Sequence, residues 1–463
     1  MSVLGPRLVV AGTHSGVGKT TVATGVMVAL RRRGLTVASA KVGPDFIDPG
    51  YHALATGRPG RNLDPWMCGE DAVAALAGRA GAGADVLVVE GVMGLFDGAA
   101  DPERPATAFG PRRPVASTAA VAALLDAPVV LVVDASGLSG SVAALVHGYA
   151  SWDPAVTVAG VILNRVGSDS HEAMLRAALA PLGVSVLGVV RRDGGLRWRD
   201  RHLGLVPVVE DEPRLRRSID LLAAAVDRSC DLDALVAVAR AAPRREAPEP
   251  PRARPSGRAR VAVLGGRSFS FSYPDNLELL EEAGAEVVPV DPEADERLPE
   301  GVDALYAGGG FPEVFAARLA ANRPLLYDVA SRVAAGLVTW AECGGLLWLA
   351  RSLDGHAMAD AVPADTRMTD RLTLGYRRFR PLVDTPLAAA GTELRGHEFH
   401  YSQCVPEGDA LAWRGREGGG RSGFASPTLL ASYLHLHLAA DPRLAERFVA
   451  MSSAAGTPTP PAV

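Results

Sequence analysis

The chain has 463 residues, of which 48% are hydrophobic and 21% charged, and its 47 basic and 52 acidic residues give a net charge of −5. This length can bury roughly two or three cores, and the negative charge excludes the global cationic field expected of a nucleic-acid-binding protein. The four cysteines lack metal-ligand spacing and no apolar run reaches about 18 residues, so we expect no zinc site, disulfide framework or membrane span, and a reducing cytoplasm as the compartment.

The first predicted element is a strand that runs through a glycine-rich turn into a helix, at "LVVAGTHSGVGKTT", residues 8–21. Backbone N–H groups and the helix N-terminus converge there on a point that suits phosphate oxygens. Lys19 would reach the outer phosphates of ATP, and Thr20 would bind Mg²⁺. We predict these nucleotide-binding residues: Gly12, Thr13, Ser15, Gly16, Val17, Gly18, Lys19, Thr20 and Thr21.

The spacing of this loop departs from the common one. Thr13 stands where the first glycine is usual, and His14 stands where partition-type ATPases with a related loop place a second lysine. The loop resembles the variant loop of dethiobiotin synthetase and its relatives. An incidental glycine-rich turn is the alternative, but strand, turn and helix are in register.

Charged residues follow the next two predicted strands, in "SAKVGPDFIDPGYH", 39–52, and "VVEGVMGLFDG", 88–98. Strand C-termini are where open parallel sheets bind ligands. Mg²⁺ prefers carboxylate oxygens, and a developing phosphoryl charge favours lysine. We predict that Lys41 contacts the nucleotide, that the metal ligands are Thr20, Asp48 and Glu90, and that the catalytic acids are Asp45, Asp48 and Asp97. For each acid the alternative is a solvated loop carboxylate.

A later strand, "VAGVILNRV", ends with Asn164 and Arg165. An amide at a strand end could read an adenine edge, so both residues are added to the predicted nucleotide site. Beyond this strand, Pro, Arg and small residues dominate "AAPRREAPEPPRARPSGRAR", 241–260, which cannot bury an apolar face. We predict an ATP-binding domain over 1–240, a linker over 241–258, a second domain over 259–445 and a disordered tail over 446–463.

In both domains, continuous Val/Ile/Leu runs alternate with helical segments such as 19–33 and 117–125. This alternation indicates two α/β domains with parallel sheets covered on both faces. In the second domain, "VTWAECGGLLWLA", 338–350, places Cys343 on a turn between a strand and a helix, which would hold the thiol outward. The other cysteines, Cys68, Cys230 and Cys404, are expected to be small buried hydrophobes.

These strings together carry a resemblance. "GTHSGVGKTT", "KVGPDFIDPGYH", "EGVMGLFDG" and "RHLGLVP", then "GGGFPE", "AECGGLLWL", "MTDRLTLGYR", "GHEFHYS" and "ASYLHLH", are similar, in order over roughly 7–440, to cobyrinic acid a,c-diamide synthases of cobalamin biosynthesis. The resemblance implies a dethiobiotin-synthetase-like P-loop ATPase fused to a class I glutamine amidotransferase domain. ATP would phosphorylate a substrate carboxylate, and ammonia made from glutamine at the thiol would displace the phosphate.

In this resemblance Cys343 attacks the glutamine amide. Backbone N–H groups of Gly309, Gly310 and Gly344 would hold the oxyanion. Strand periodicity over 429–438 puts Tyr433, His435 and His437 on one face. Matching to the family selects His435 as the base. Many class I amidotransferases carry a glutamate two residues further on, where this chain has His437, so the partner that orients His435 is open.

The expected partners are small molecules: a corrinoid polycarboxylate, glutamine and ATP. No nucleic acid and no membrane are expected, and a homodimer is left as an option. Arginines and aromatic residues in 191–205 and 365–380 are candidates for the corrin, although a charge run is commonly a solvated face. Metal-free hydrogenobyrinic acid is favoured over cobalt-containing cobyrinic acid on composition alone. Three alternatives stay open: a cobyric acid synthase, a nickel-tetrapyrrole a,c-diamide synthase, and a partition or regulatory ATPase of a different class.

Overall fold

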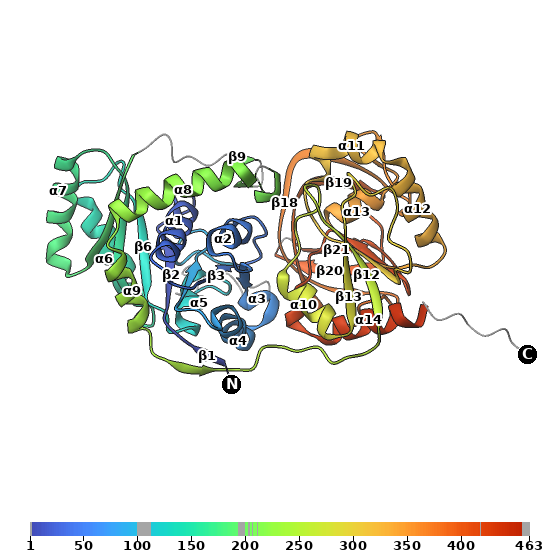
Figure 1. Ribbon diagram of the computed structural model, residues 1–463, viewed down its shortest axis with the longest axis horizontal. Coiled ribbons are helices and arrows are strands. Elements are labelled where there is room, and N and C mark those ends of the chain that lie inside the picture. The colour runs from blue at the N-terminus through green and yellow to red at the C-terminus, as the bar shows by residue number, and fades with distance from the viewer. Residues whose placement is uncertain are drawn as a thin grey trace, which may run out of the picture. The chain divides into compact units, whose positions relative to one another are not determined.

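A computed structural model describes residues 2–99, 113–192, 200–201, 204–205, 207–210, 212–416 and 418–455 (Figure 1). The chain divides into two compact units, Met1–Pro250 and Pro251–Val463. Their boundary lies within the stretch predicted as a linker. Part of that stretch, however, is regular: β11 (Arg245–Ala247) pairs with β1 (Ser2–Leu4), so residues 245–247 belong to the first unit.

The first unit is built on a seven-stranded parallel sheet, as the buried apolar runs predict. Its strands, in spatial order, are β4 (Arg61–Leu63), β3 (Val37–Val42), β5 (Val86–Glu90), β2 (Arg7–Gly12), β6 (Val129–Asp134), β7 (Val158–Val166) and β8 (Ser185–Arg191). A separate short pair joins β9 (Asp200–Arg201) to β10 (Gly204–Leu205). The C-terminal ends of β5, β2 and β6 therefore meet at one edge of the sheet.

Helices cover this sheet: α1 (Lys19–Arg32), α2 (Asp48–Thr56), α3 (Pro65–Cys68), α4 (Glu70–Gly81), α5 (Thr118–Leu124), α6 (Ser141–Ser151), α7 (Asp169–Leu179), α8 (Glu212–Ser229) and α9 (Leu232–Ala241), with short 3₁₀ turns at Ala180–Leu182 and Val208–Glu210. Helices α1, α8 and α9 share one core with alternate residues of β2 and β6. Figure 1 shows α8 beside α1, and Gly25 permits this approach because a Cβ there would lie 2.5 Å from Val226. This core fixes α1 beneath the phosphate loop.

The second unit has a six-stranded sheet, parallel except for its last strand: β13 (Ala285–Val290), β12 (Ala259–Leu264), β14 (Ala304–Ala307), β15 (Val338–Glu342), β23 (Leu429–Ser432) and β22 (Phe424–Ser426). Its helices are α10 (Pro274–Glu282), α11 (Ala316–Ala321), α12 (Arg323–Ala334), α13 (Gly344–Leu349) and α14 (Arg443–Ala455), with 3₁₀ turns at Pro312–Phe315 and Leu438–Ala440. The parallel sheet confirms the predicted α/β class.

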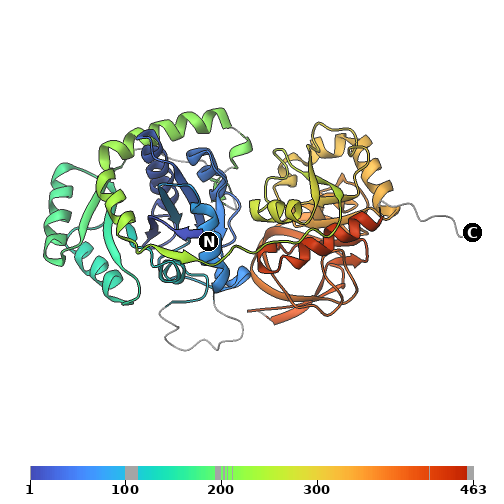
Figure 2. The ribbon, with the colours of Figure 1, turned by 60° about the horizontal axis from the view of Figure 1, so that its bottom comes forward.

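Helix α14 corrects the prediction of a disordered tail from residue 446. Phe448 and Val449 are fully buried, and α14 lies against α10, β12 and β15 (Figure 2). Because Phe448, Val449 and Leu444 supply an apolar face, residues 446–455 complete the core of the second unit. The final residues, 456–463, lie outside the described part of the chain.

A mostly antiparallel sheet in the second unit was not predicted. It contains β17 (His356–Ala357), β16 (Ser352–Leu353), β18 (Asp365–Pro381), β20 (Leu411–Gly415) and β21 (Gly418–Ser422), and β19 (Leu394–Val405) pairs with β18. Among the described strands of this sheet, only β16 and β18 pair in parallel. In the described residues no helix is long and apolar enough to cross a membrane.

Candidate active sites

The phosphate loop lies between β2 and α1, as predicted. All six residues of β2 are buried, and the turn uses Gly16 (φ 80°) and Gly18 (φ 95°) in the left-handed region that favours glycine. Helix α1 begins at Lys19, so its free N–H groups face the loop. Thr13 is buried and Ser15 is exposed, while Thr20 and Thr21 are half-buried. The backbone of this segment is thus arranged to bind phosphate.

Side chains from β7 hold the loop in place. Asn164 Nδ2 donates to the carbonyl of Val17 at 2.7 Å, and Arg165 Nη2 donates to the carbonyl of Gly16 at 2.8 Å. A Cβ on Gly18 would lie 2.4 Å from Asn164 Nδ2, so this contact also requires glycine. Arg165 further pairs with Asp134. The contacts support the loop directly; the adenine-reading role of Asn164 stays a prediction.

Three predicted metal ligands come together beside Lys19. Thr20 Oγ1 donates to Glu90 Oε1 at 2.6 Å, and Asp48 Oδ2 lies 3.3 Å from the same hydroxyl. Lys19 is buried, and burial together with the neighbouring charge of Lys41 lowers its pKa to about 8. A nucleotide phosphate would restore the favoured charge of this lysine.

Lys41 links the two carboxylates. Its Nζ lies 2.6 Å from Asp48 Oδ2 and 2.8 Å from Glu90 Oε1, and all three side chains are nearly buried. Burial disfavours its charge, but Asp48 and Glu90 outweigh burial and raise the pKa of Lys41. Burial and the nearby Asp45 raise the pKa of Asp48. The ammonium group of Lys41 is paired with Asp48 and Glu90. Its contact with the nucleotide therefore stays a prediction.

His52 is a member of this cluster that the sequence analysis missed. It lies on α2, is fully buried, and places Nε2 2.6 Å from Glu90 Oε2. Burial opposes ionisation of Glu90, but Lys41 and the hydrogen bond from His52 outweigh it and lower the pKa of Glu90. The signal was present, because "DPGYH" ends in this histidine and one turn of helix separates it from Asp48.

The two remaining acids shape loops. Asp45 Oδ1 accepts from the backbone N–H groups of Ile47 and Asp48, at 2.7 and 3.0 Å, and thereby starts α2. Asp97 is exposed, and its Oδ2 accepts from Gly94 N at 2.9 Å. Gly94 approaches the phosphate loop, since a Cβ there would lie 2.9 Å from the carbonyl of Thr13. Both acids therefore border the site, and their catalytic roles stay predictions.

In the second unit, Cys343 occupies the predicted sharp turn. It follows β15 directly, precedes α13, and has φ 47° and ψ −100°. A non-glycine residue rarely adopts such a backbone, and such strain is often stored at functional sites. The turn is fixed because Cys343 N donates to the carbonyl of Ser432 at 2.8 Å.

Glycines surround this turn, but their roles differ from the prediction. The N–H of Gly309 is already donated to the carbonyl of Phe271, at 3.1 Å, so Gly309 is wrong as an oxyanion donor. It instead leaves room for the imidazole of His435, because a Cβ there would lie 2.5 Å from His435 Cε1. Gly310 and Gly344 touch, since a Cβ on Gly344 would lie 2.9 Å from Gly310 N. The backbone N–H groups of these two stay the candidates for the oxyanion hole.

His435 is buried beside the thiol. Burial disfavours the imidazolium, but its hydrogen bond with Cys343 and the charge of Glu342 outweigh burial and raise the pKa of His435 to about 10. His435 Nδ1 lies 3.7 Å from Glu342 Oε2. Glu342, the residue before the cysteine, is a second group that the sequence analysis did not single out.

The predicted strand over 429–438 ends at Ser432. His437 stacks on Tyr273, with ring centroids 4.5 Å apart, and its Nδ1 accepts from Ala439 N. It is thus anchored against the start of α10.

Of the other cysteines, Cys230 and Cys404 are buried as predicted, and burial raises the pKa of each thiol to about 12; Cys68 is half-buried.

The "GHEFHYS" string forms part of β19 and lies beside His435. His397 and His435 exchange backbone hydrogen bonds of 2.9 and 3.1 Å. Arg377 and Glu398 form a buried pair, with Nε 3.0 Å from Oε2.

Other arginines of 365–380 are paired as well. Arg378 and Arg380 both contact Glu393. Contact of this stretch with a corrin stays a prediction, and residues 193–199, 202–203 and 206 lie outside the described part of the chain.

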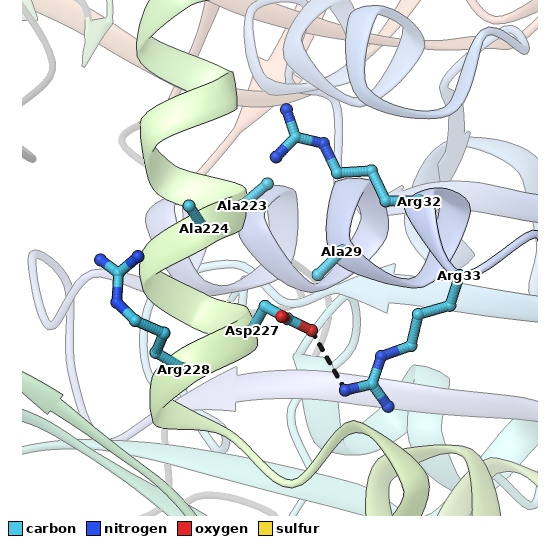
Figure 3. A pocket seen from close by; sticks show the side chains of 7 residues that line it. All are labelled: Ala29, Arg32, Arg33, Ala223, Ala224, Asp227 and Arg228. Carbon is cyan, nitrogen blue, oxygen red and sulfur yellow. Dashed lines mark hydrogen bonds and ion pairs between the residues drawn. The ribbon is translucent and has the colours of Figure 1, made fainter.

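A cleft of about 380 Å³ between α1 and α8 is lined by Ala29, Arg32, Arg33, Ala223, Ala224, Asp227 and Arg228 (Figure 3). It lies at the C-terminal end of α1, about 20 Å along the helix from the phosphate loop. Arg33 pairs with Asp227 at 3.1 Å, as Figure 3 shows, and Arg32 pairs with Asp220. These arginines complement the dipole of α1 and are no part of either site.

Two features define a class: a phosphate loop with clustered acids in one unit, and in the other a cysteine on a strained turn beside a buried histidine. The class is a nucleotide-binding domain joined to a glutamine amidotransferase domain. Residues 8–206 match the CobQ/CobB/MinD/ParA nucleotide binding domain, and residues 260–443 match the CobB/CobQ-like glutamine amidotransferase domain.

Full-length relatives narrow this class. The chain is 50% identical to hydrogenobyrinate a,c-diamide synthase of Streptomyces coelicolor, over 96% of this chain and 97% of the relative. It is 48% identical to the Mycobacterium bovis enzyme of the same name, over 97% and 98%, and 44% identical to cobyrinate a,c-diamide synthase of Syntrophotalea carbinolica, over 96% and 98%. The chain belongs to the family of hydrogenobyrinate and cobyrinate a,c-diamide synthases.

Proposed function

We propose that this protein uses ATP and glutamine to convert the a and c acetate carboxylates of hydrogenobyrinic acid into amides. The observation that carries the proposal is the presence, in one chain of this family, of a complete phosphate site around Lys19 and a thiol–imidazole pair at Cys343 and His435. Relatives named for hydrogenobyrinate reach 50% identity and those named for cobyrinate 44%, which favours the metal-free substrate over cobyrinic acid.

In the first unit, a substrate carboxylate oxygen attacks the γ-phosphorus of ATP, giving an acyl phosphate and ADP. The loop N–H groups and Lys19 hold the phosphates and stabilise the charge that develops on them. The acyl phosphate turns a poor leaving group into a good one. Ammonia then attacks the acyl carbon, inorganic phosphate leaves, and the nitrogen loses one proton.

Mg²⁺ fits the donor set of Thr20, Asp48 and Glu90, because a hydroxyl and two carboxylates are hard oxygen ligands and both carboxylates already lie within hydrogen-bonding distance of the hydroxyl. In the described residues no group of three or more His, Cys, Asp or Glu side chains could hold a metal alone, so phosphate and water oxygens would complete its shell. When bound, Mg²⁺ neutralises phosphate charge. Lys41 and His52 keep Glu90 ionised and oriented toward Thr20.

In the second unit, His435 accepts the Sγ–H proton and the Cys343 thiolate attacks the side-chain amide of glutamine. The proton passes to the departing nitrogen, which leaves as NH₃. Water then cleaves the thioester to give glutamate and the free thiol. The N–H groups of Gly310 and Gly344 stabilise the oxyanion of each tetrahedral intermediate. Free thiols throughout the described chain suit a reducing cytoplasm.

The test is to incubate the purified protein with ATP, Mg²⁺ and glutamine, and with hydrogenobyrinic or cobyrinic acid in separate reactions. We expect two successive mass decreases, each equal to the difference between OH and NH₂, with a higher kcat/KM for hydrogenobyrinic acid. Turnover of neither acid, together with turnover of a corrinoid already amidated at a and c, would identify a cobyric acid synthase and contradict the proposal.

A further inference from the structure

Glu342, the residue before Cys343, carries a carboxylate that is buried inside the second unit. Glu342 ends β15, a strand buried along its whole length, and its side chain is 2% exposed. Its Oε1 accepts from Leu436 N at 2.7 Å, and its Oε2 accepts from Tyr306 O–H at 3.0 Å. Both partners are neutral.

A buried carboxylate is costly unless a cation compensates it. In the described residues the cation-forming group within 4 Å of Glu342 is the imidazole of His435, whose Nδ1 lies 3.7 Å from Oε2. Catalytic hydrogen bonds are often long before a substrate binds, so this separation suits a contact that shortens during turnover. The charge of Glu342 is thus directed at one ring nitrogen.

Two features fix the carboxylate of Glu342 in its position next to Nδ1 of His435. Tyr306 stacks on Trp340, with centroids 4.0 Å apart, and so fixes the hydroxyl that anchors Oε2. Leu436 follows His435 directly, so the bond from its N–H to Oε1 fastens the backbone of the histidine to the same carboxylate. The carboxylate therefore fixes the position of His435 through both backbone and side chain.

We propose that Glu342 is the positioning residue of His435: it accepts a hydrogen bond from Nδ1–H, orients Nε2 toward the thiol of Cys343, and replaces the glutamate that many class I amidotransferases carry two residues after the histidine. This inference rests on the proposed roles of Cys343 and His435. During turnover the Nδ1 proton stays on the ring, and only the Nε2 proton moves, first from sulfur and then to the leaving nitrogen.

The titratable groups that face His435 come from two elements. Cys343 and Glu342 approach from the end of β15, and on β19 the side chains of His397, Glu398 and His400 are close enough for the charge of His435 to shift the pKa of each. Burial and His435 lower the pKa of His397 to about 3, and burial lowers the pKa of His400 to about 4, so both stay neutral near pH 7. Glu398 is paired with Arg377.

The test measures glutamine hydrolysis by the full-length protein across pH. We expect Glu342→Gln to lower kcat/KM for glutamine by about 10²-fold or more, because the imidazole loses its orientation. We also expect a change in the plot of kcat/KM against pH. Its alkaline limb, which reports loss of the His435 proton, should move to lower pH by about 1–3 units when the negative charge of Glu342 is removed. Glu342→Asp keeps the charge and should leave the limb near its wild-type position.

Glu398→Gln is the matched control, since it makes the same change in a buried glutamate near His435 that already has Arg377 as partner. The limb should not move. An unmoved limb in Glu342→Gln, whatever its rate, would overturn the assignment, as would a limb that moves in Glu398→Gln alone. Ammonium-supported amidation and thermal unfolding check that each variant is folded. Hydrolysis that persists in Cys343→Ala would instead contradict the proposed function.

Discussion

Two buried glutamates, Glu90 and Glu342, end inner strands of the two parallel sheets and are used differently. Glu90 has a full cation, Lys41 at 2.8 Å, and a histidine, His52 at 2.6 Å. Glu342 has two neutral donors and a histidine 3.7 Å away. A strand end places a carboxylate equally well in both units. The partners of the carboxylate then decide its role. The charge of Glu90 is neutralised by a fixed ion pair, whereas the charge of Glu342 acts on an imidazole that titrates.

The largest expected effect concerns the imidazole side of this comparison. His435→Ala should lower the glutamine-dependent amidation rate by about 10⁴-fold, because nucleophile and base act as a unit. Ammonium chloride should still support amidation. His437→Ala should cost far less, since His437 stacks on Tyr273 instead of meeting the thiol. Steady-state rates with both nitrogen sources check this, and the reverse ranking of the two histidines would show that the family match is displaced by two residues.

The phosphate side should respond to both nitrogen sources. Lys19→Ala removes a charge that stabilises the transferred phosphoryl group, so amidation should fall by about 10²–10³-fold with glutamine and with ammonium chloride alike. Some glutamine hydrolysis should persist, because the thiol site is in the other unit. Near-normal amidation in a folded Lys19→Ala protein would place the phosphate site elsewhere.

A smaller effect is expected on stability, where substitution of Glu90 should lower the free energy of unfolding more than substitution of Glu342. Glu90→Gln leaves the buried Lys41 with Asp48 as its remaining carboxylate and should destabilise the first unit by about 3 kcal/mol. Glu342→Gln keeps an oxygen for Leu436 N and should cost the second unit about 1 kcal/mol.

Urea unfolding, with the transition of each unit followed separately, measures both free energies. The surrounding charges make Glu90 more acidic, so its stabilising effect is present above its unfolded-state pKa and is lost as pH falls. If the two substitutions lowered the free energy of unfolding equally at neutral pH, the difference between the partners of Glu90 and Glu342 would not affect stability.

Local patterns explain which features the sequence predicted. The phosphate loop, the acids at strand ends and the turn at Cys343 each depend on a few consecutive residues, so strings such as "GVGKTT" identify them. His52 and Glu342 were missed because their roles arise from partners 38 and 93 residues away, His52 with Glu90 and Glu342 with His435. For Glu342 the sequence carries no local signature of such a contact, whereas the spacing of His52 from Asp48 on one helix face was a signal that could have been read.

The over-predicted strand after residue 432 has a physical reason as well. Alternating leucines in "SYLHLHL" mimic a strand, but side chains take the backbone groups that a neighbouring strand would bond. Glu342 accepts from Leu436 N, and Asn276 accepts from Leu438 N and donates to the carbonyl of Leu436. Similarly, the antiparallel sheet of β18–β21 was missed because long-range pairing, not continuous apolar runs, defines it.

The most direct test of the account is the nitrogen source used by Cys343→Ala. With ATP, Mg²⁺ and hydrogenobyrinic acid, this variant should lose glutamine-dependent amidation by at least about 10⁴-fold while ammonium chloride restores product at close to the wild-type ammonium rate. That result would show that the thiol serves only to make ammonia. Equal loss with glutamine and with ammonium chloride, in a protein that unfolds at the wild-type temperature, would contradict the assignment of two separate chemistries to the two units.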